Sequence, residues 1–124
     1  MNKAGEIDIR TAVVWWFVTI GYMGIIFYLS SLQDIDISRF PSNFDKVVHT
    51  CIYIPLSFLL YLSLRRIGIK KYIFIMAFVL ASIYGISDEI HQLFVPGRDA
   101  AIGDVLADTL GAFIGSLAAN FTKT

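Results

Sequence analysis

Cysteine and charge are both scarce in this 124-residue sequence. The one cysteine, Cys51, excludes an internal disulfide framework and a cysteine-rich metal site, and its apolar neighbours predict that its side chain is buried. Charged residues make up 16% of the chain and the formal net charge is zero, which gives no support for nucleic-acid binding. Hydrophobic residues make up 56% and the mean hydropathy is +0.68. A soluble domain of this size could not bury so much apolar surface, so we expect an integral membrane protein.

Stretches with few charged residues divide the chain into four long segments. A helix needs ~20 residues to cross a hydrocarbon core of ~30 Å, and each segment has about that length. The first segment is longer than the usual ~7–15-residue core of a signal peptide and no small-x-small cleavage site follows it, so we expect a retained span. The sequence therefore predicts an all-α bundle of about four transmembrane helices in a single domain over residues 1–124, with spans near 11–32, 46–64, 71–94 and 103–121.

The basic residues are divided unequally between the two sides of such a bundle. On the side of the two termini lie Lys3, Arg10, Arg65, Arg66, Lys70, Lys71 and Lys123. On the other side lie only Arg39, Lys46 and Arg98. Cytoplasmic loops carry the excess of lysine and arginine, so both termini are predicted to be cytoplasmic. All acidic residues except Glu6 and Asp8 lie on or near the opposite, outer side.

Three ionisable residues reach one depth when each is measured from the cytoplasmic basic residue of its own span. At a rise of ~1.5 Å per residue, His49, Asp88 and Asp108 all lie roughly 22–25 Å from that end. This depth is within ~10 Å of the outer boundary of the hydrocarbon core. Other polar residues lie about one turn away: Asp45, Gln92 and Asp104 on the outer side, and Tyr53 and Tyr84 on the inner side.

Helical spacing places these residues on shared faces. Residues four apart lie on one face of a helix, so three spans each carry one polar stripe. The stripes are Asp45, His49 and Tyr53; Tyr84, Asp88 and Gln92; and Asp104 and Asp108. Ionisable side chains in a membrane face a cavity or a partner rather than lipid, so we expect the stripes to form a polar cup. The predicted cup holds His49, Asp88 and Asp108 together, with Arg98 at its rim.

Two glycines continue the last of these stripes toward the cytoplasmic side. Gly111 and Gly115 are four residues apart and follow Asp108 on the same face. Small residues at this spacing let a second membrane helix approach closely. The sequence therefore predicts a tight helix–helix contact beneath the polar cup.

Four segments resemble the VanZ-like membrane protein family. They are residues 28–31 (YLSS), 44–53 (FDKVVHTCIY), 84–98 (YGISDEIHQLFVPGR) and 104–115 (DVLADTLGAFIG). The sequence departs from the family pattern at Asp108, where the family often has Asn. The resemblance implies a protein of the bacterial cytoplasmic membrane and a link to glycopeptide (teicoplanin) resistance. It implies no particular reaction.

The polar cup is compatible with an enzyme that acts on a lipid-linked phosphate or another cell-envelope lipid at the outer leaflet. The candidate catalytic residues are His49, Asp88, Glu89, Asp45 and Asp108. The candidate substrate-binding residues are Arg98, Gln92, Tyr53, Tyr84, Asp104 and His91. His49 could act as a general base or a nucleophile. Paired carboxylates could hold a divalent metal ion, which makes a metal a candidate cofactor whose presence the sequence leaves open.

Two other interpretations remain open at this point. Intramembrane Asp and His residues also form substrate sites in transporters, so the cup could belong to a small transporter subunit or a lipid- or glycopeptide-binding module without chemistry. The same polar pairs could also simply join membrane helices. If the protein is an enzyme, a transporter subunit or a binding module, the expected partner is a membrane lipid or lipid-linked cell-wall precursor. The sequence does not determine the oligomeric state.

Overall fold

The computed structural model of the protein describes residues 7–32, 44–96 and 102–122, and this part of the chain contains four helices and no strand. The helices are α1 (Ile9–Ser31), α2 (Phe44–Arg66), α3 (Ile73–Gln92) and α4 (Ile102–Asn120). Each of them is long and apolar enough to cross a membrane. The prediction of an all-α membrane bundle of four helices is therefore confirmed.

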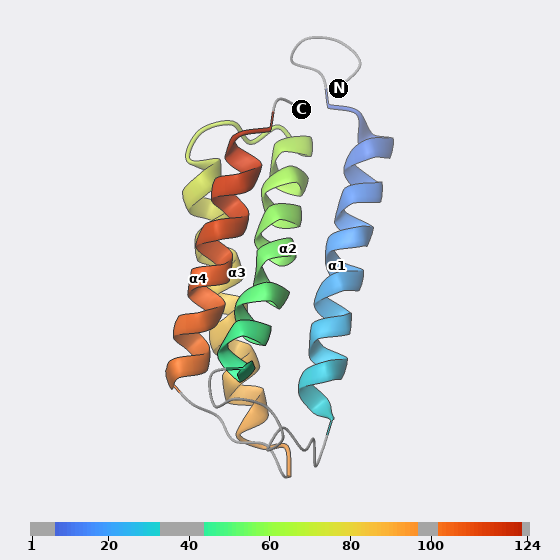
Figure 1. The fold of residues 1–124 in the computed structure, drawn as a ribbon. Helices are drawn as coiled ribbons and strands as arrows, with labels where there is room; N and C mark the ends of the chain where they lie inside the picture. Colours follow the sequence, from blue (N-terminus) through green and yellow to red (C-terminus); the bar gives the residue numbers. More distant parts are fainter. Residues whose placement is uncertain (1–6, 33–43, 97–101, 123–124) are drawn as a thin grey trace.

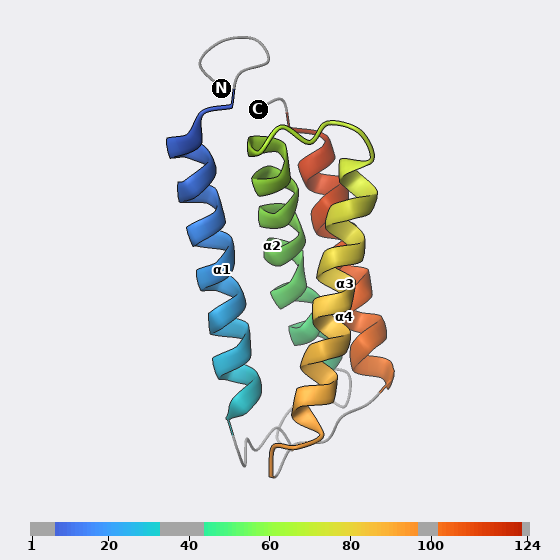
Figure 2. The ribbon, with the colours of Figure 1, turned by 180° about the vertical axis from the view of Figure 1, so that it is seen from behind.

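Consecutive helices run in opposite directions, so the first residue of α1 and the last residue of α4 lie at the same end of the bundle (Figure 1). α2 contacts each of the other helices and packs most extensively against α4. Within the described residues, α1 contacts only α2 and α3, and it forms one edge of the bundle in both views (Figure 1, Figure 2). The start of α2, the end of α3 and the start of α4 meet at the opposite end, where the sequence places the polar residues.

The helix boundaries lie within two residues of the predicted spans, and local chemistry explains them. Asp8 caps α1, because its side chain accepts hydrogen bonds from the Arg10 backbone amide at 3.1 Å and from the Thr11 hydroxyl at 3.0 Å. The hydrogen bond from Thr11 lowers the pKa of Asp8 below its ordinary value. α3 begins only at Ile73, because Tyr72 has a left-handed backbone with a φ of 61°.

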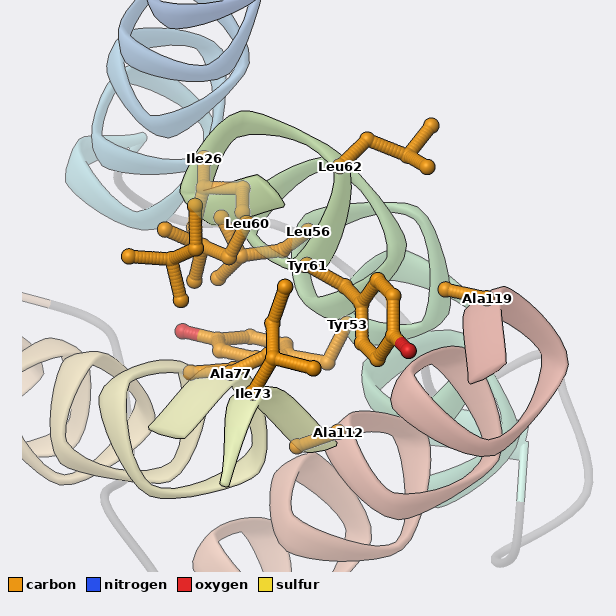
Figure 3. Packing of buried hydrophobic residues seen from close by; sticks show 12 residues of the cluster. Ile26, Tyr53, Leu56, Leu60, Tyr61, Leu62, Ile73, Ala77, Ala112 and Ala119 are labelled. Carbon is orange, nitrogen blue, oxygen red and sulfur yellow. The ribbon is translucent and has the colours of Figure 1, made fainter. Parts of the chain in front are cut away.

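The apolar core lies between the helices, on the side of the polar residues that faces the start of α1 and the end of α4. Tyr53, Leu56 and Leu60 of α2 form one buried cluster with Ile26 of α1 and Ala77 of α3 (Figure 3). Many large apolar side chains on the outer faces of the helices are instead exposed. This distribution is expected of a membrane bundle, because lipid tails are as apolar as the core.

Cys51 is exposed, so the prediction that its side chain is buried was wrong. It lies on α2 between His49 and Tyr53, which are both buried and therefore turn residue 51 away from the other helices. An apolar stretch in a membrane protein contains lipid-facing side chains as well as core side chains. Apolar neighbours alone thus do not predict burial.

Two glycines of α4 let this helix approach the backbone of α2. A Cβ atom on Gly111 would collide with the carbonyl oxygen of Thr50, and a Cβ atom on Gly115 would collide with the carbonyl oxygen of Ile54. At the same contact the Ser57 hydroxyl donates to the Ala112 carbonyl oxygen of α4 at 2.6 Å. The predicted close approach at these glycines is confirmed, and it fixes how α2 and α4 present their polar residues to each other.

Candidate functional site

His49 lies at the centre of the polar residues that the structure brings together. Its Nδ1 atom lies 2.9 Å from Asp108 Oδ1. Its Nε2 atom lies 3.6 Å from Asp45 Oδ1 and 3.8 Å from Asp104 Oδ2. Asp45 precedes His49 by one turn of α2, whereas both other acids belong to α4. One imidazole therefore faces carboxylates on both of its sides.

Lys46 neutralises the outer side of this arrangement. Its Nζ atom lies 2.5 Å from Asp104 Oδ1 and 3.5 Å from Asp45 Oδ2, which are the two carboxylate oxygens that do not face His49. Asp104 is only 2% exposed, and a buried carboxylate is stable when a charged partner compensates it. Sequence reasoning treated Lys46 only as a basic residue on the outer side. The signal that could have identified it is its place beside Asp45, at the predicted depth of Asp104.

α3 adds two buried acids to the site. Asp88 is 7% exposed and Glu89 is 5% exposed. The Tyr53 hydroxyl donates a long hydrogen bond to Asp88 Oδ2 at 3.4 Å. We call the seven ionisable residues that lie together the polar cluster: Asp45, Lys46, His49, Asp88, Glu89, Asp104 and Asp108. Among the described residues it contains five carboxyl groups, one ammonium group and one imidazole.

A cavity of about 210 Å³ reaches the polar cluster from between α1, α2 and α3. Its polar lining consists of His49, Tyr53, Asp88, Gln92 and Ser30. Its apolar lining consists of Ile26, Leu29, Leu32, Val48 and Ile52. The apolar residues of α1 are part of the site that sequence reasoning missed. Their signal was weak, because in a membrane helix an apolar side chain facing a cavity has the same residue type as one facing lipid.

The sequence around this site matches a known protein family. The sequence model of the VanZ/LLP1 family matches residues 11–123, nearly the whole chain. The chain belongs to the VanZ/LLP1 family. No curated protein and no solved structure matches it. The matched range includes every residue of the polar cluster and of the cavity lining, so both lie within the VanZ/LLP1 domain.

Two predicted site residues of the VanZ/LLP1 chain point toward α1 instead of the polar cluster. His91 Nε2 lies 2.9 Å from the Ser31 hydroxyl, and the His91 ring stacks on Phe27 with the ring centroids 4.5 Å apart. The Tyr84 hydroxyl donates to the Met23 carbonyl oxygen at 2.7 Å. These contacts join α3 to α1 beside the cavity. Arg98, the predicted rim residue, lies outside the described residues.

The polar cluster offers two groups of side chains that could hold a metal ion. One consists of Asp45, His49 and Asp104, and the other of His49, Glu89 and Asp108. Within each group the ligand atoms all lie within 4.8 Å of one another. The arrangement could therefore bind a cation, transfer protons at the cavity wall, or do both.

Proposed function

We propose that this VanZ/LLP1 protein acts on the phosphate of a membrane lipid or of a lipid-linked cell-wall precursor. The observation that supports this most directly is the cavity, whose apolar walls lead to the polar side chains of His49, Tyr53, Asp88 and Gln92. A lipid phosphate has the same division, because an apolar chain is attached to a small charged headgroup. Its lining comes from three helices that are each long and apolar enough to span a membrane, which suits a ligand that arrives from the bilayer.

Asp88 is the residue that we propose as the general base. It lines the cavity, is buried, and accepts a hydrogen bond from Tyr53. A general base must lie within hydrogen-bond reach of the water or hydroxyl that it activates, and a cavity-lining carboxylate meets this condition. His49 lines the same cavity and connects it to the acids of α4. The proposed reaction is thus hydrolysis or transfer of the lipid phosphate.

We further propose that the protein lies in the bacterial cytoplasmic membrane with the polar cluster near the outer surface. The basic residues Arg10, Arg65, Arg66, Lys70 and Lys71 all lie at or beyond the helix ends remote from the cluster. The positive-inside rule makes that end cytoplasmic. The cavity would then open to the outer leaflet.

Cysteine labelling in intact cells tests this orientation. In a Cys51→Ser background, a membrane-impermeant thiol reagent is expected to label Phe94→Cys, because residue 94 is 80% exposed and follows the outer end of α3. It is expected to leave Lys70→Cys unlabelled until the cells are permeabilised. Labelling of position 70 but not of position 94 in intact cells would invert the proposed orientation.

The family resemblance links the proposed activity to glycopeptide (teicoplanin) resistance. An enzyme that changes a lipid-linked cell-wall precursor at the outer leaflet would change the material that a glycopeptide meets at the cell surface. We therefore propose resistance as a consequence of the lipid reaction. Expression of the wild-type chain, but not of Asp88→Asn, is then expected to lower susceptibility to teicoplanin.

The proposed function is tested by turnover. Purified protein in nanodiscs is incubated with a polyprenyl phosphate, a polyprenyl diphosphate or a phospholipid, and released phosphate and lipid products are measured against empty nanodiscs. We expect saturable turnover of at least one of these lipids. Saturable binding with the lipid unchanged would restrict the function to lipid binding. The absence of both binding and turnover would contradict the proposal.

A further inference from the structure

We infer that His49, Glu89 and Asp108 bind one divalent transition-metal ion, such as Zn²⁺ or Mn²⁺, in the deeper part of the polar cluster. The three residues come from α2, α3 and α4, and all three are buried. Their ligand atoms lie within 4.8 Å of one another. An imidazole nitrogen with two carboxylate oxygens is a ligand set that these ions accept.

The burial and hydrogen bonding of the Asp108 carboxylate give independent support for a bound cation. Asp108 is fully buried, with 0% of the residue exposed. Its Oδ1 atom lies beside His49, but its Oδ2 atom has no hydrogen-bond partner among the described residues. A buried carboxylate oxygen without a partner costs free energy, so a native structure usually supplies a proton, a water or a cation there.

Gly85 shows which way this oxygen faces. A Cβ atom at Gly85 would lie 3.1 Å from Asp108 Oδ2 and 2.9 Å from Asp108 Cβ. Gly85 and Glu89 are four residues apart and therefore share one face of α3. The Oδ2 atom of Asp108 is thus turned toward the face of α3 that carries Glu89. The absence of a side chain at residue 85 leaves room for the carboxylate to do so.

His49 is held in a way that suits a metal ligand. Two ligand atoms that each lie ~2.1 Å from one ion are roughly 3.0 Å apart in an octahedral site and roughly 3.4 Å apart in a tetrahedral one. His49 Nδ1 and Asp108 Oδ1 are 2.9 Å apart, which is closest to the octahedral value. With Nδ1 on the ion, Nε2 carries the proton and faces Asp45 and Asp104 at 3.6 and 3.8 Å. A carboxylate behind the imidazole is the usual second partner of a metal-bound histidine.

The alternative group of Asp45, His49 and Asp104 is the less favourable one, because the ammonium group of Lys46 would repel a second cation there. Asp45 and Asp104 already have the ammonium group of Lys46 as a counter-charge. A metal ion in the deeper group would add positive charge where Asp88 and the cavity lie beside it. Its role toward a lipid phosphate rests on the proposed function, since it would offset the repulsion between an anionic headgroup and the carboxylates. Its binding does not rest on that function.

Titration of the metal-free protein with Mn²⁺ tests the inference without any lipid phosphate. The full chain is purified, stripped with EDTA, placed in detergent, and titrated while the signal of free Mn²⁺ is followed by electron paramagnetic resonance. We expect saturable binding of one ion per chain, and Zn²⁺ is expected to displace it. The absence of saturable binding by both ions would overturn the inference, whether or not the protein turns over lipid.

Variants of the two groups locate the ion. Asp108→Asn and Glu89→Gln are each expected to weaken Mn²⁺ binding by about ten-fold or more. Asp104→Asn removes one of the two carboxylates behind the His49 imidazole, and it is expected to weaken binding less than either of these variants because Asp45 still faces Nε2.

Asp8→Asn is the matched control, because Asp8 precedes α1 at the opposite end of the bundle, and it is expected to bind Mn²⁺ as the wild type does. Helix content by circular dichroism identifies the folded variants. The test needs only one of Glu89→Gln and Asp108→Asn to fold. Wild-type affinity in folded Glu89→Gln or Asp108→Asn would overturn the assignment, as would loss of binding in Asp104→Asn alone.

Discussion

Asp88→Asn is expected to lower turnover of the lipid phosphate by about 100-fold or more, the range in which general acid–base catalysis contributes. The substitution keeps the size of the side chain and removes its ability to accept a proton. Asp88 lines the cavity and accepts a hydrogen bond from the Tyr53 hydroxyl. An asparagine side chain at this position has nearly the same shape and can accept the same hydrogen bond, so much of the local packing is kept. The measurement is the initial rate of phosphate release in nanodiscs.

Ser87→Ala is the matched control for this variant. Ser87 is the exposed neighbour of Asp88, and within the described part of the chain its hydroxyl donates to the Tyr84 carbonyl oxygen of the same helix at 2.7 Å. Its turnover is expected to stay within two-fold of the wild type. A folded Asp88→Asn protein with full turnover would remove Asp88 from the reaction.

Gly111→Ala and Gly115→Ala are each expected to lower the free energy of unfolding by about 1–3 kcal/mol, the usual cost of overpacking a close contact. The added methyl groups would meet the carbonyl oxygens of Thr50 and Ile54, which belong to the α2 backbone and cannot turn aside as a side chain can. The helices must therefore separate. Unfolding by SDS, followed by circular dichroism, measures the loss.

Gly21 and Gly24 of α1 provide the controls for the same substitution. A Cβ atom at either position would meet nothing within 4 Å. Alanine is a better helix former than glycine by ~1 kcal/mol, so Gly21→Ala and Gly24→Ala are expected to be neutral or slightly stabilising. If Gly115→Ala unfolded at the same SDS concentration as Gly24→Ala, the close contact of α2 and α4 would be refuted.

The four helices could be predicted from the sequence because hydropathy and length together determine a membrane span. The depth of the polar residues followed from the fixed rise of a helix, and their common faces followed from its period. His49 and Asp108 could thus be assigned to one level before their contact was known. Both arguments depend only on helix geometry.

The rotation of each helix about its axis could not be predicted in the same way. Packing sets this rotation, through contacts such as Gly111 on Thr50, and no local pattern encodes it. For this reason Tyr84 and His91, which lie near the right depth, point toward α1. The same limit hid the pairing of Lys46 with Asp104, which joins residues 58 positions apart.

A double-mutant cycle between His49 and Asp108 tests the convergence of the polar residues most directly. The free energy of unfolding is measured for His49→Ala, Asp108→Ala and the double variant. His49→Ala and Thr19→Val form a distant control pair, because Thr19 of α1 hydrogen-bonds to Ser63, which lies roughly 21 Å along α2 from His49. Residues in direct contact are expected to show a coupling of about 1 kcal/mol or more, whereas the control pair is expected to be additive within ~0.5 kcal/mol. Additive effects of His49 and Asp108 in folded variants would contradict the shared site.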